Sequence, residues 1–227
     1  MRIVHSAGVV GAREARGLVV VIDVLRAFTV SAFALAGGAA EVLYVADLER
    51  AREVAAGIPG AVLSAEVDGL PVAGVPISNS PTMIAAADLA GRTLVQRSSA
   101  GVQSLVAATA ATRLFAASLV VVGPTARRVA ELEPEVVTMV ASRPDHLEDA
   151  ACAEFLAALL EGREPDLEAL LAPLRATPRY AELAAGAVPG FPATDLELSL
   201  ATDRFDFALP VKRGAGGVLR ITRERRP

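Results

Sequence analysis

One short stretch constrains the fold of this chain more than any other. Residues 18–22, Leu-Val-Val-Val-Ile, are all apolar and mostly β-branched, and Asp23 follows them directly. A run this short and this apolar predicts a central strand that is covered on both faces. Asp23 and Arg26 then lie where the strand should leave the sheet, which is where open α/β sheets bind ligands. These two residues could serve a cation and an anion, or Asp23 could simply cap the next helix and pair with Arg26.

Strand-like and helix-like segments alternate along the following 140 residues, which predicts a largely parallel sheet between two helical layers. Further strands are expected at residues 2–4, 42–45, 61–63, 93–96, 113–116 and 136–140. Helices are expected at residues 32–36, 48–56, 102–111, 124–132 and 145–161, and one more begins at Pro81. In the helix at 145–161, Asp145 and Glu148 have the spacing of a capping box.

The pattern changes after Gly162. Two short helices are expected at residues 166–174 and 178–185, and a closing pair of strands at 205–209 and 217–221. The predicted fold is therefore a three-layer α/β/α architecture with a mostly parallel mixed sheet and with helical and β-hairpin additions at the C-terminus. A length of 227 residues fits a single domain, in which residues 162–227 could form a C-terminal subdomain. Residues 223–227 are expected to fray.

Composition excludes several classes of protein. No apolar run approaches the roughly 18 residues of a membrane span, and charged residues interrupt the first 17 residues, so neither a membrane helix nor a signal peptide is expected. A net charge of −4 and an aromatic content of 4% argue against a nucleic-acid partner. The single cysteine, Cys152, fits a reducing cytoplasm. We therefore expect a cytoplasmic protein, and the sequence leaves a homodimer open.

Several standard catalytic motifs are absent. The chain has neither the G-x-x-x-x-G-K-[ST] phosphate loop nor the G-x-G-x-x-G dinucleotide fingerprint. Cys152 has no arginine six residues later, so we expect a small core residue. His5 and His146 are too few and too isolated for a histidine phosphatase or a zinc site, and His146 is expected to be exposed. Leu25 stands where aspartyl-phosphate enzymes carry a second aspartate, which disfavours covalent catalysis by Asp23.

What remains is a set of polar residues at predicted strand ends and helix starts. The carboxylates are Asp23, Glu66, Glu148 and Asp149; the amides, hydroxyls and guanidiniums are Asn79, Ser80, Ser98, Ser99, Arg26 and Arg97. Carboxylates are what Mg²⁺ selects, and arginines are what a phosphate selects. The set suggests metal-assisted phosphoryl chemistry. Glu148 could instead be only a capping residue, and Asp149 could only complement the helix dipole.

Four stretches resemble the 2-phosphosulfolactate phosphatase (ComB) family of coenzyme M biosynthesis. They are Val-Ile-Asp-Val-Leu-Arg-Ala at 21–27, Gly74 through Asn-Ser-Pro at 79–81, Leu-Glu-Asp-Ala-Ala-Cys-Ala at 147–153, and Asp-Arg-Phe-Asp-Phe at 203–207. The resemblance implies an α/β/α fold and Mg²⁺-dependent hydrolysis of a phosphate ester on a small sulfonated acid. Two departures concern the substrate: Val67 replaces an arginine that usually follows Glu66, and Ser-Ser-Ala-Gly at 98–101 replaces Thr-Asn-Gly-Thr.

The resulting hypothesis is a Mg²⁺-dependent phosphatase that converts 2-phosphosulfolactate, or a similar phosphorylated 2-hydroxy acid, to the free acid and phosphate. Asp23, Glu66 and Asp149 would hold the metal, and Glu148 would be a further ligand or a base that positions water. The residues expected to orient the ester are Arg26, Asn79, Ser80, Arg97, Ser98 and Ser99. Three alternatives stay open: a non-catalytic protein that binds metal and anion, an enzyme for another phosphorylated acid, and a metal-dependent lyase or isomerase.

Overall fold

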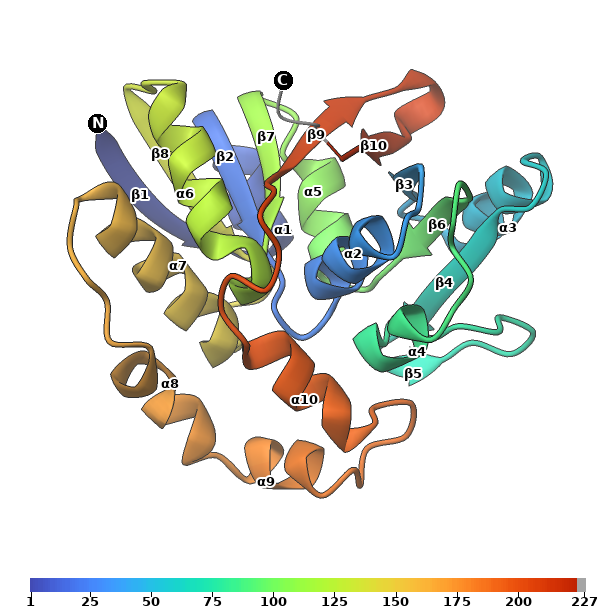
Figure 1. Cartoon of the computed structure of the whole chain (residues 1–227). Helices are drawn as coiled ribbons and strands as arrows, with labels where there is room; N and C mark the ends of the chain where they lie inside the picture. Colours follow the sequence, from blue (N-terminus) through green and yellow to red (C-terminus); the bar gives the residue numbers. More distant parts are fainter. Residues whose placement is uncertain (224–227) are drawn as a thin grey trace.

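The structure is a computed structural model that describes residues 1–223, so most of the segment expected to fray lies outside the described residues. It confirms the α/β fold, with a single ten-stranded mixed sheet and helices on both of its faces (Figure 1). The strands are β1 Arg2–Ala7, β2 Gly17–Ile22, β3 Glu41–Tyr44, β4 Val62–Val67, β5 Leu70–Pro71, β6 Thr93–Arg97, β7 Ala111–Ala117, β8 Val136–Ala141, β9 Leu209–Arg213 and β10 Leu219–Ile221. The helices are α1 Gly8–Glu14, α2 Ala27–Ala36, α3 Leu48–Ala56, α4 Pro81–Ala85, α5 Gly101–Ala107, α6 Val122–Glu131, α7 Leu147–Leu160, α8 Leu167–Arg175, α9 Pro178–Ala184 and α10 Ala193–Leu200, with short 3₁₀ turns at Leu119–Val121 and Ala215–Gly217.

The sheet consists of two parallel halves joined by the C-terminal hairpin. Its strand order is β1-β8-β2-β7-β9-β10-β3-β6-β4-β5. Strands β1, β8, β2 and β7 run parallel to one another, and so do β3, β6 and β4. Between these halves, β9 pairs antiparallel with β7, and β10 pairs antiparallel with both β9 and β3. The predicted hairpin is therefore present, and it forms the middle of the sheet.

The first strand of the hairpin begins four residues later than its sequence pattern predicts. Phe205 does not join the sheet, because its backbone N–H donates to Val120 O and its ring packs edge-on against Phe33. The ladder with β7 starts only at Leu209. The alternation of Phe205 and Phe207 with polar residues thus reflects packing of a loop against helix α2 and its neighbours.

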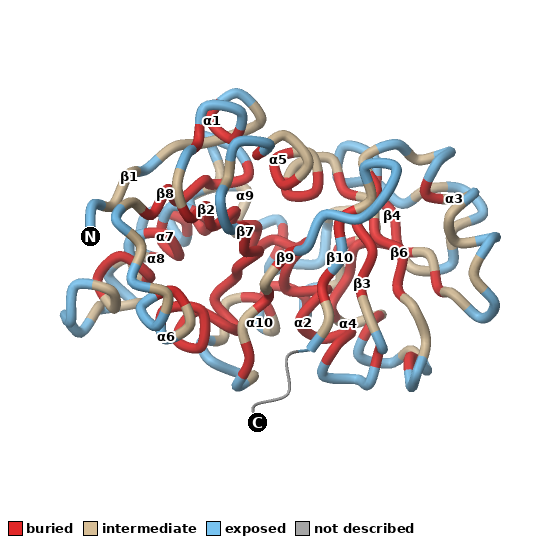
Figure 2. Tube along the Cα trace, turned by 90° about the horizontal axis from the view of Figure 1, so that it is seen from above, coloured by how far each residue is buried: buried red, intermediate tan, exposed pale blue. Residues whose placement is uncertain are grey.

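Strand β2 is buried on both faces, as its composition predicts. Val19 and Val21 belong to one hydrophobic cluster, whereas Leu18, Val20 and Ile22 belong to another on the opposite side. The first cluster includes residues of α1, α2, α4 and α5, and the second includes residues of α6 to α10. On the other half of the sheet, α3 covers the face that α2 and α4 leave open. Figure 2 shows the pattern of burial: the strands and the inner faces of the helices are buried, and exposed loops surround them.

Two helices were not expected from the sequence, and α2 starts five residues earlier than expected. Helix α2 begins at Ala27 and is buried along nearly its whole length, so it lacks the alternation of polar and apolar faces that reveals a surface helix. Helices α1 and α10 are short and were missed. In the described residues no helix is long and apolar enough to span a membrane. The division into domains stays a prediction.

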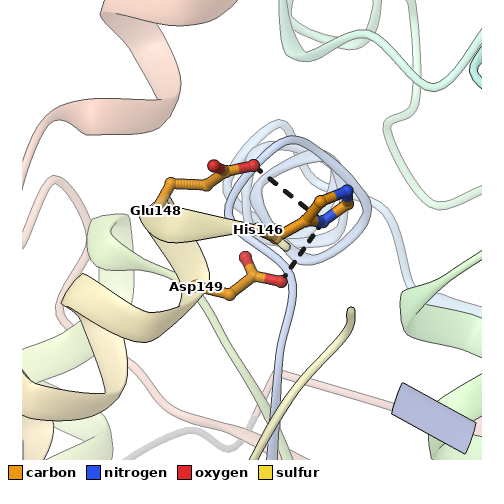
Figure 3. Close-up of side chains that lie close together, drawn as sticks. All are labelled: His146, Glu148 and Asp149. Carbon is orange, nitrogen blue, oxygen red and sulfur yellow. Dashed lines mark ion pairs between the residues drawn. The ribbon is translucent and has the colours of Figure 1, made fainter. Parts of the chain in front are cut away.

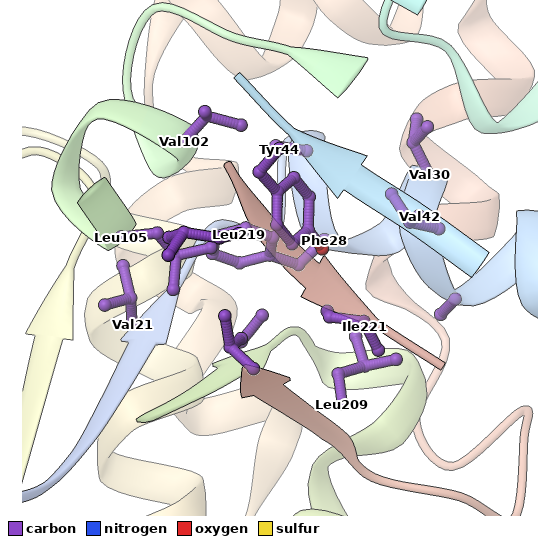
Figure 4. Packing of buried hydrophobic residues seen from close by; sticks show 14 of the residues in the cluster. Val21, Phe28, Val30, Val42, Tyr44, Val102, Leu105, Leu209, Leu219 and Ile221 are labelled. Carbon is purple, nitrogen blue, oxygen red and sulfur yellow. The ribbon is translucent and has the colours of Figure 1, made fainter. Parts of the chain in front are cut away.

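The position of the hairpin makes its apolar residues part of the main core. Leu219 is 2% exposed and packs in the same cluster as Val21 of β2 and Tyr44 of β3 (Figure 4). We expect Leu219→Ala to lower the free energy of unfolding by about 2–5 kcal/mol, the usual cost of a core cavity. Urea unfolding followed by circular dichroism measures it. Leu70→Ala, at a side chain that is 51% exposed, is the matched control. If Leu219→Ala lowers the free energy of unfolding no more than this control does, the hairpin is not part of the main core.

Candidate active site

A cavity of about 290 Å³ lies where the loops after β2, β4 and β6 meet. On the far side of the hairpin β9–β10, the strands run in the opposite direction to β2; these are β3, β6 and β4. In a flat sheet their carboxyl ends would therefore lie at the opposite edge from the carboxyl end of β2. Sheets twist from strand to strand, however, and here the loops after β2 and β6 are in direct contact. The backbone N–H of Gly101, after β6, donates to Asp23 Oδ2, after β2, at 2.9 Å. The cavity thus collects residues from both halves of the sheet.

Asp23 lies in the wall of this cavity and is held by two backbone amides. Its Oδ1 accepts from Ala27 N at 3.0 Å, at the start of α2, and its Oδ2 accepts from Gly101 N. A Cβ at position 101 would come within 2.5 Å of Asp23 Oδ2, so only glycine allows this approach. Burial, together with the negative charge of Asp149, raises the pKa of Asp23 to about 7. The sequence suggested that Asp23 could cap the next helix and pair with Arg26. The capping contact of Asp23 with α2 is present, and an ion pair between Asp23 and Arg26 is absent.

Glu66 reaches the same cavity from the end of β4. Its two carboxylate oxygens accept hydrogen bonds from the backbone N–H groups of Ser99 and Gly69. Arg97 fixes this arrangement from outside the cavity, because its Nη1 donates to Glu66 O and to Ser99 Oγ. Of the two predicted serines that follow β6, Ser99 lines the cavity, whereas Ser98 accepts from Val102 N at 3.1 Å and serves as a helix cap.

Asp149 and Glu148 lie behind the cavity wall, and both are fully buried. Asp149 Oδ1 accepts from Val24 N at 2.8 Å, and its Oδ2 accepts from the backbone N–H and the hydroxyl of Ser142. Glu148 accepts a bidentate pair of bonds from Arg179 at 2.8 and 2.9 Å. Asp149 therefore fixes the turn that carries Asp23, and Glu148 binds the first turn of α9.

The structure corrects the predictions about the start of helix α7. The N-cap is His146, not Asp145, and no side chain caps the first turn. Asp145 is exposed and pairs with Arg143, while Glu148 faces inward to Arg179, so the capping box does not form. His146 is not exposed: its side chain is 16% accessible and lines the cavity.

His146, Glu148 and Asp149 converge within 4.8 Å of one another (Figure 3). Within residues 1–223 this is the only group of three acidic, histidine or cysteine side chains that is so close, so Asp23, Glu66 and Asp149 do not make such a group. His146 Nδ1 lies 3.6 Å from Asp149 Oδ2 and 3.9 Å from Glu148 Oε1. Burial acts against the charged imidazole, but these carboxylates leave the pKa of His146 raised above its ordinary value.

Arg26 lines the cavity, yet its guanidinium is engaged elsewhere. Its Nη1 donates to Asp195 Oδ2 at 2.6 Å and to Gly190 O at 2.7 Å, and the group stacks over Phe191 at 4.3 Å from the ring centroid. Asp195 also accepts from Ser80 Oγ at 2.8 Å. Arg26 and Ser80 therefore anchor helix α10 and the loop before it.

Of the ten predicted site residues, five line the cavity and five support it from behind. The lining residues are Asp23, Arg26, Glu66, Asn79 and Ser99, and the supporting ones are Ser80, Arg97, Ser98, Glu148 and Asp149. Sequence analysis missed the cavity residues Arg143, His146, Arg179 and Phe191. Arg143 and His146 are close in sequence to the predicted pair Glu148 and Asp149, which could have drawn attention to them. No local sequence pattern marks Arg179 or Phe191 as a site residue.

Comparison with known proteins identifies relatives of this chain. The model of the 2-phosphosulpholactate phosphatase family matches residues 5–177. The chain belongs to this family. A probable 2-phosphosulfolactate phosphatase of Bacillus subtilis is 35% identical over 145 residues, which are 63% of this chain and 64% of that protein. Proteins described in the same words are 36% identical over 144 residues in Carboxydothermus hydrogenoformans (63% of this chain, 60% of the relative) and 34% over 164 residues in a Synechococcus strain (70% and 67%).

The alignments thus span about two thirds or somewhat less of each relative. Arg179, Phe191 and Asp195 lie beyond the residues that the family model matches. The acidic part of the cavity therefore comes from the family-matched region, and part of the opposite wall comes from the C-terminal segment.

The raised pKa of Asp23 makes a prediction about stability. In the folded protein the ionised carboxylate is disfavoured, so without metal the wild type loses stability as the pH rises from about 4 to about 7. Asp23→Asn removes this titration. With EDTA present, we compare the free energy of unfolding of the variant with that of the wild type. We expect this difference to shift in favour of the variant between pH 4 and pH 8 by at least about 1.4 kcal/mol, the equivalent of one pKa unit. Urea unfolding at each pH measures the difference, and a difference that is independent of pH would refute the assignment.

Proposed function

We propose that this protein is a phosphatase that hydrolyses the phosphate ester of a small anionic 2-hydroxy acid, namely 2-phosphosulfolactate to sulfolactate and phosphate. The observation that carries the proposal is that Asp23, directly after β2, and Glu66, near the end of β4 in the other half-sheet, line one cavity. Membership of the 2-phosphosulfolactate phosphatase family supports the same reaction. Cytoplasmic location, a homodimer and a place in coenzyme M biosynthesis stay predictions.

The acidic residues fit a hard divalent cation, and we propose Mg²⁺. Carboxylate oxygens are its preferred protein ligands. Asp23 is buried close to Asp149 and accepts only two hydrogen bonds, and the positive charge of His146 offsets its ionised form only in part, since the pKa of Asp23 stays raised. Asp23 and Glu66 are the residues that would hold the metal from the protein side. Bound there, Mg²⁺ would neutralise phosphoryl oxygens and lower the pKa of bound water.

Asp149 was a third candidate ligand, and we now propose a positioning role for it. Both of its oxygens already accept hydrogen bonds from Val24 and Ser142, and it does not line the cavity. It fixes the backbone directly after Asp23 and contributes negative charge. His146 lies between Asp149 and the cavity and can hold or release a proton at the cavity wall.

Asn79 can orient the phosphoryl group. Its Oδ1 accepts from Gln96 Nε2 at 3.0 Å, and Gln96 is itself held by Ser31 Oγ. This chain of bonds fixes the amide of Asn79, a residue of the cavity lining whose Nδ2 makes no hydrogen bond to any described residue. A fixed donor of this kind stabilises charge that develops on phosphoryl oxygens in the transition state.

Phosphate release from 2-phosphosulfolactate tests the proposal. We expect turnover with Mg²⁺, loss of turnover with EDTA, and recovery on adding Mg²⁺ in excess. Glu66→Gln keeps the size of the side chain but removes its charge, and should lower kcat/KM by at least about 100-fold, or ~2.7 kcal/mol of transition-state stabilisation. Glu53→Gln on α3, whose side chain is 66% exposed, is the matched control. No release by the wild type, or full activity of Glu66→Gln, would reject the proposal.

A further inference from the structure

The charges along the cavity are arranged with one polarity. Glu66 and Asn79 come from the β4 side of the sheet, and Asp23 comes from the end of β2. Arg143 follows β8, the neighbour of β2 on the opposite side, and Arg179 lies in the first turn of α9. Apart from Arg26, which follows β2, the carboxylates of the lining thus come from the β2 and β4 side and the guanidinium groups from the β8 and α9 side.

We propose that Arg143 and Arg179 form a subsite for an acid group of the substrate other than its phosphate. The proposal rests on the proposed function and assigns the guanidinium end of the cavity to the part of the substrate remote from the ester. Arginine binds planar or tetrahedral oxyanions through several N–H donors at once, which suits a sulfonate or a carboxylate.

The three arginines that line the cavity differ in how far they are already engaged. Arg26 is 4% exposed and its Nη1 is bound to Asp195 and Gly190, so it is less available to an anion than the other two arginines. Arg179 gives two of its five N–H donors to Glu148 and keeps 40% of its side chain exposed. Arg143 donates only from Nε, to Asp145, and its two terminal nitrogens make no hydrogen bond to any described residue. Arg143 is thus the most available of the three arginines that line the cavity, and Arg179 follows it.

Glu148 positions Arg179 for this role. The carboxylate is fully buried and binds both terminal nitrogens of the guanidinium, so the orientation of Arg179 is fixed relative to helix α7. His146, just before the same helix, lines the same cavity as the two arginines and Asp23. A ligand that spans this wall would place its phosphate near Asp23 and a second anion near the arginines.

Calorimetric binding of product analogues tests the subsite separately from catalysis. Sulfolactate carries the sulfonate without a phosphate, and lactate lacks both groups. We expect the wild type to bind sulfolactate at least 10-fold more tightly than lactate, and Arg143→Gln to lose at least 10-fold of its affinity for sulfolactate while its affinity for lactate is unchanged. Arg163→Gln, at an exposed arginine paired with Glu161 outside the cavity, is the matched control and should bind like the wild type.

Arg179→Lys provides a second variant that keeps a positive charge beside buried Glu148, and should weaken sulfolactate binding with little change in melting temperature. In hydrolysis, Arg143→Gln should lower kcat/KM for 2-phosphosulfolactate at least 10-fold and for phospholactate, which lacks the sulfonate, less than 3-fold. Equal affinities of the wild type for sulfolactate and lactate, or unchanged sulfolactate binding by Arg143→Gln, would overturn the subsite. Selective sulfolactate binding without any hydrolysis would keep the subsite and reject the phosphatase.

Discussion

The hydrogen bond between Gly101 N and Asp23 Oδ2 joins the two halves of this protein at its site. Asp23 directly follows β2 of one parallel half-sheet, and Gly101 begins helix α5, which follows β6 of the other. The contact requires a glycine, because any Cβ at position 101 would collide with the carboxylate. The hairpin β9–β10 joins the two halves in the middle of the sheet, because β9 pairs with β7 and β10 pairs with β3. The cavity thus collects residues from both halves.

Around this contact, the acidic groups are divided between those that face the cavity and those that hold the wall in place. Asp149 and Glu148 are buried behind the wall, bound by backbone amides and by Arg179 respectively. Asp195 plays the same part for the C-terminal segment through its buried ion pair with Arg26. Buried ion pairs of this kind add little net stability, because desolvation offsets the attraction, but they are sensitive to the loss of either partner. Their arrangement here fixes the positions of the turns that form the cavity.

Much of the fold follows from local patterns in the sequence. The short apolar run of β2 and the N-cap at Ser80 are local features, and the structure confirms both. The place of the hairpin in the sheet depends instead on contacts between residues about 100 apart, such as Leu114 with Val211, which no local pattern encodes. The same limit applies to the site. Asp23 and Glu66 could be found because both follow strands, whereas Arg179 reaches the cavity only through the tertiary placement of α9.

The central claim is that Asp23 and Glu66 together bind a divalent cation in the shared cavity. A crystal structure of the protein soaked with Mn²⁺ and inorganic phosphate, with anomalous scattering data at the manganese edge, tests this most directly. The account predicts one strong anomalous peak within ligand distance of a carboxylate oxygen of Asp23 and one of Glu66, with phosphate beside it. A peak centred on His146, Glu148 and Asp149, or no peak in the cavity, would contradict it.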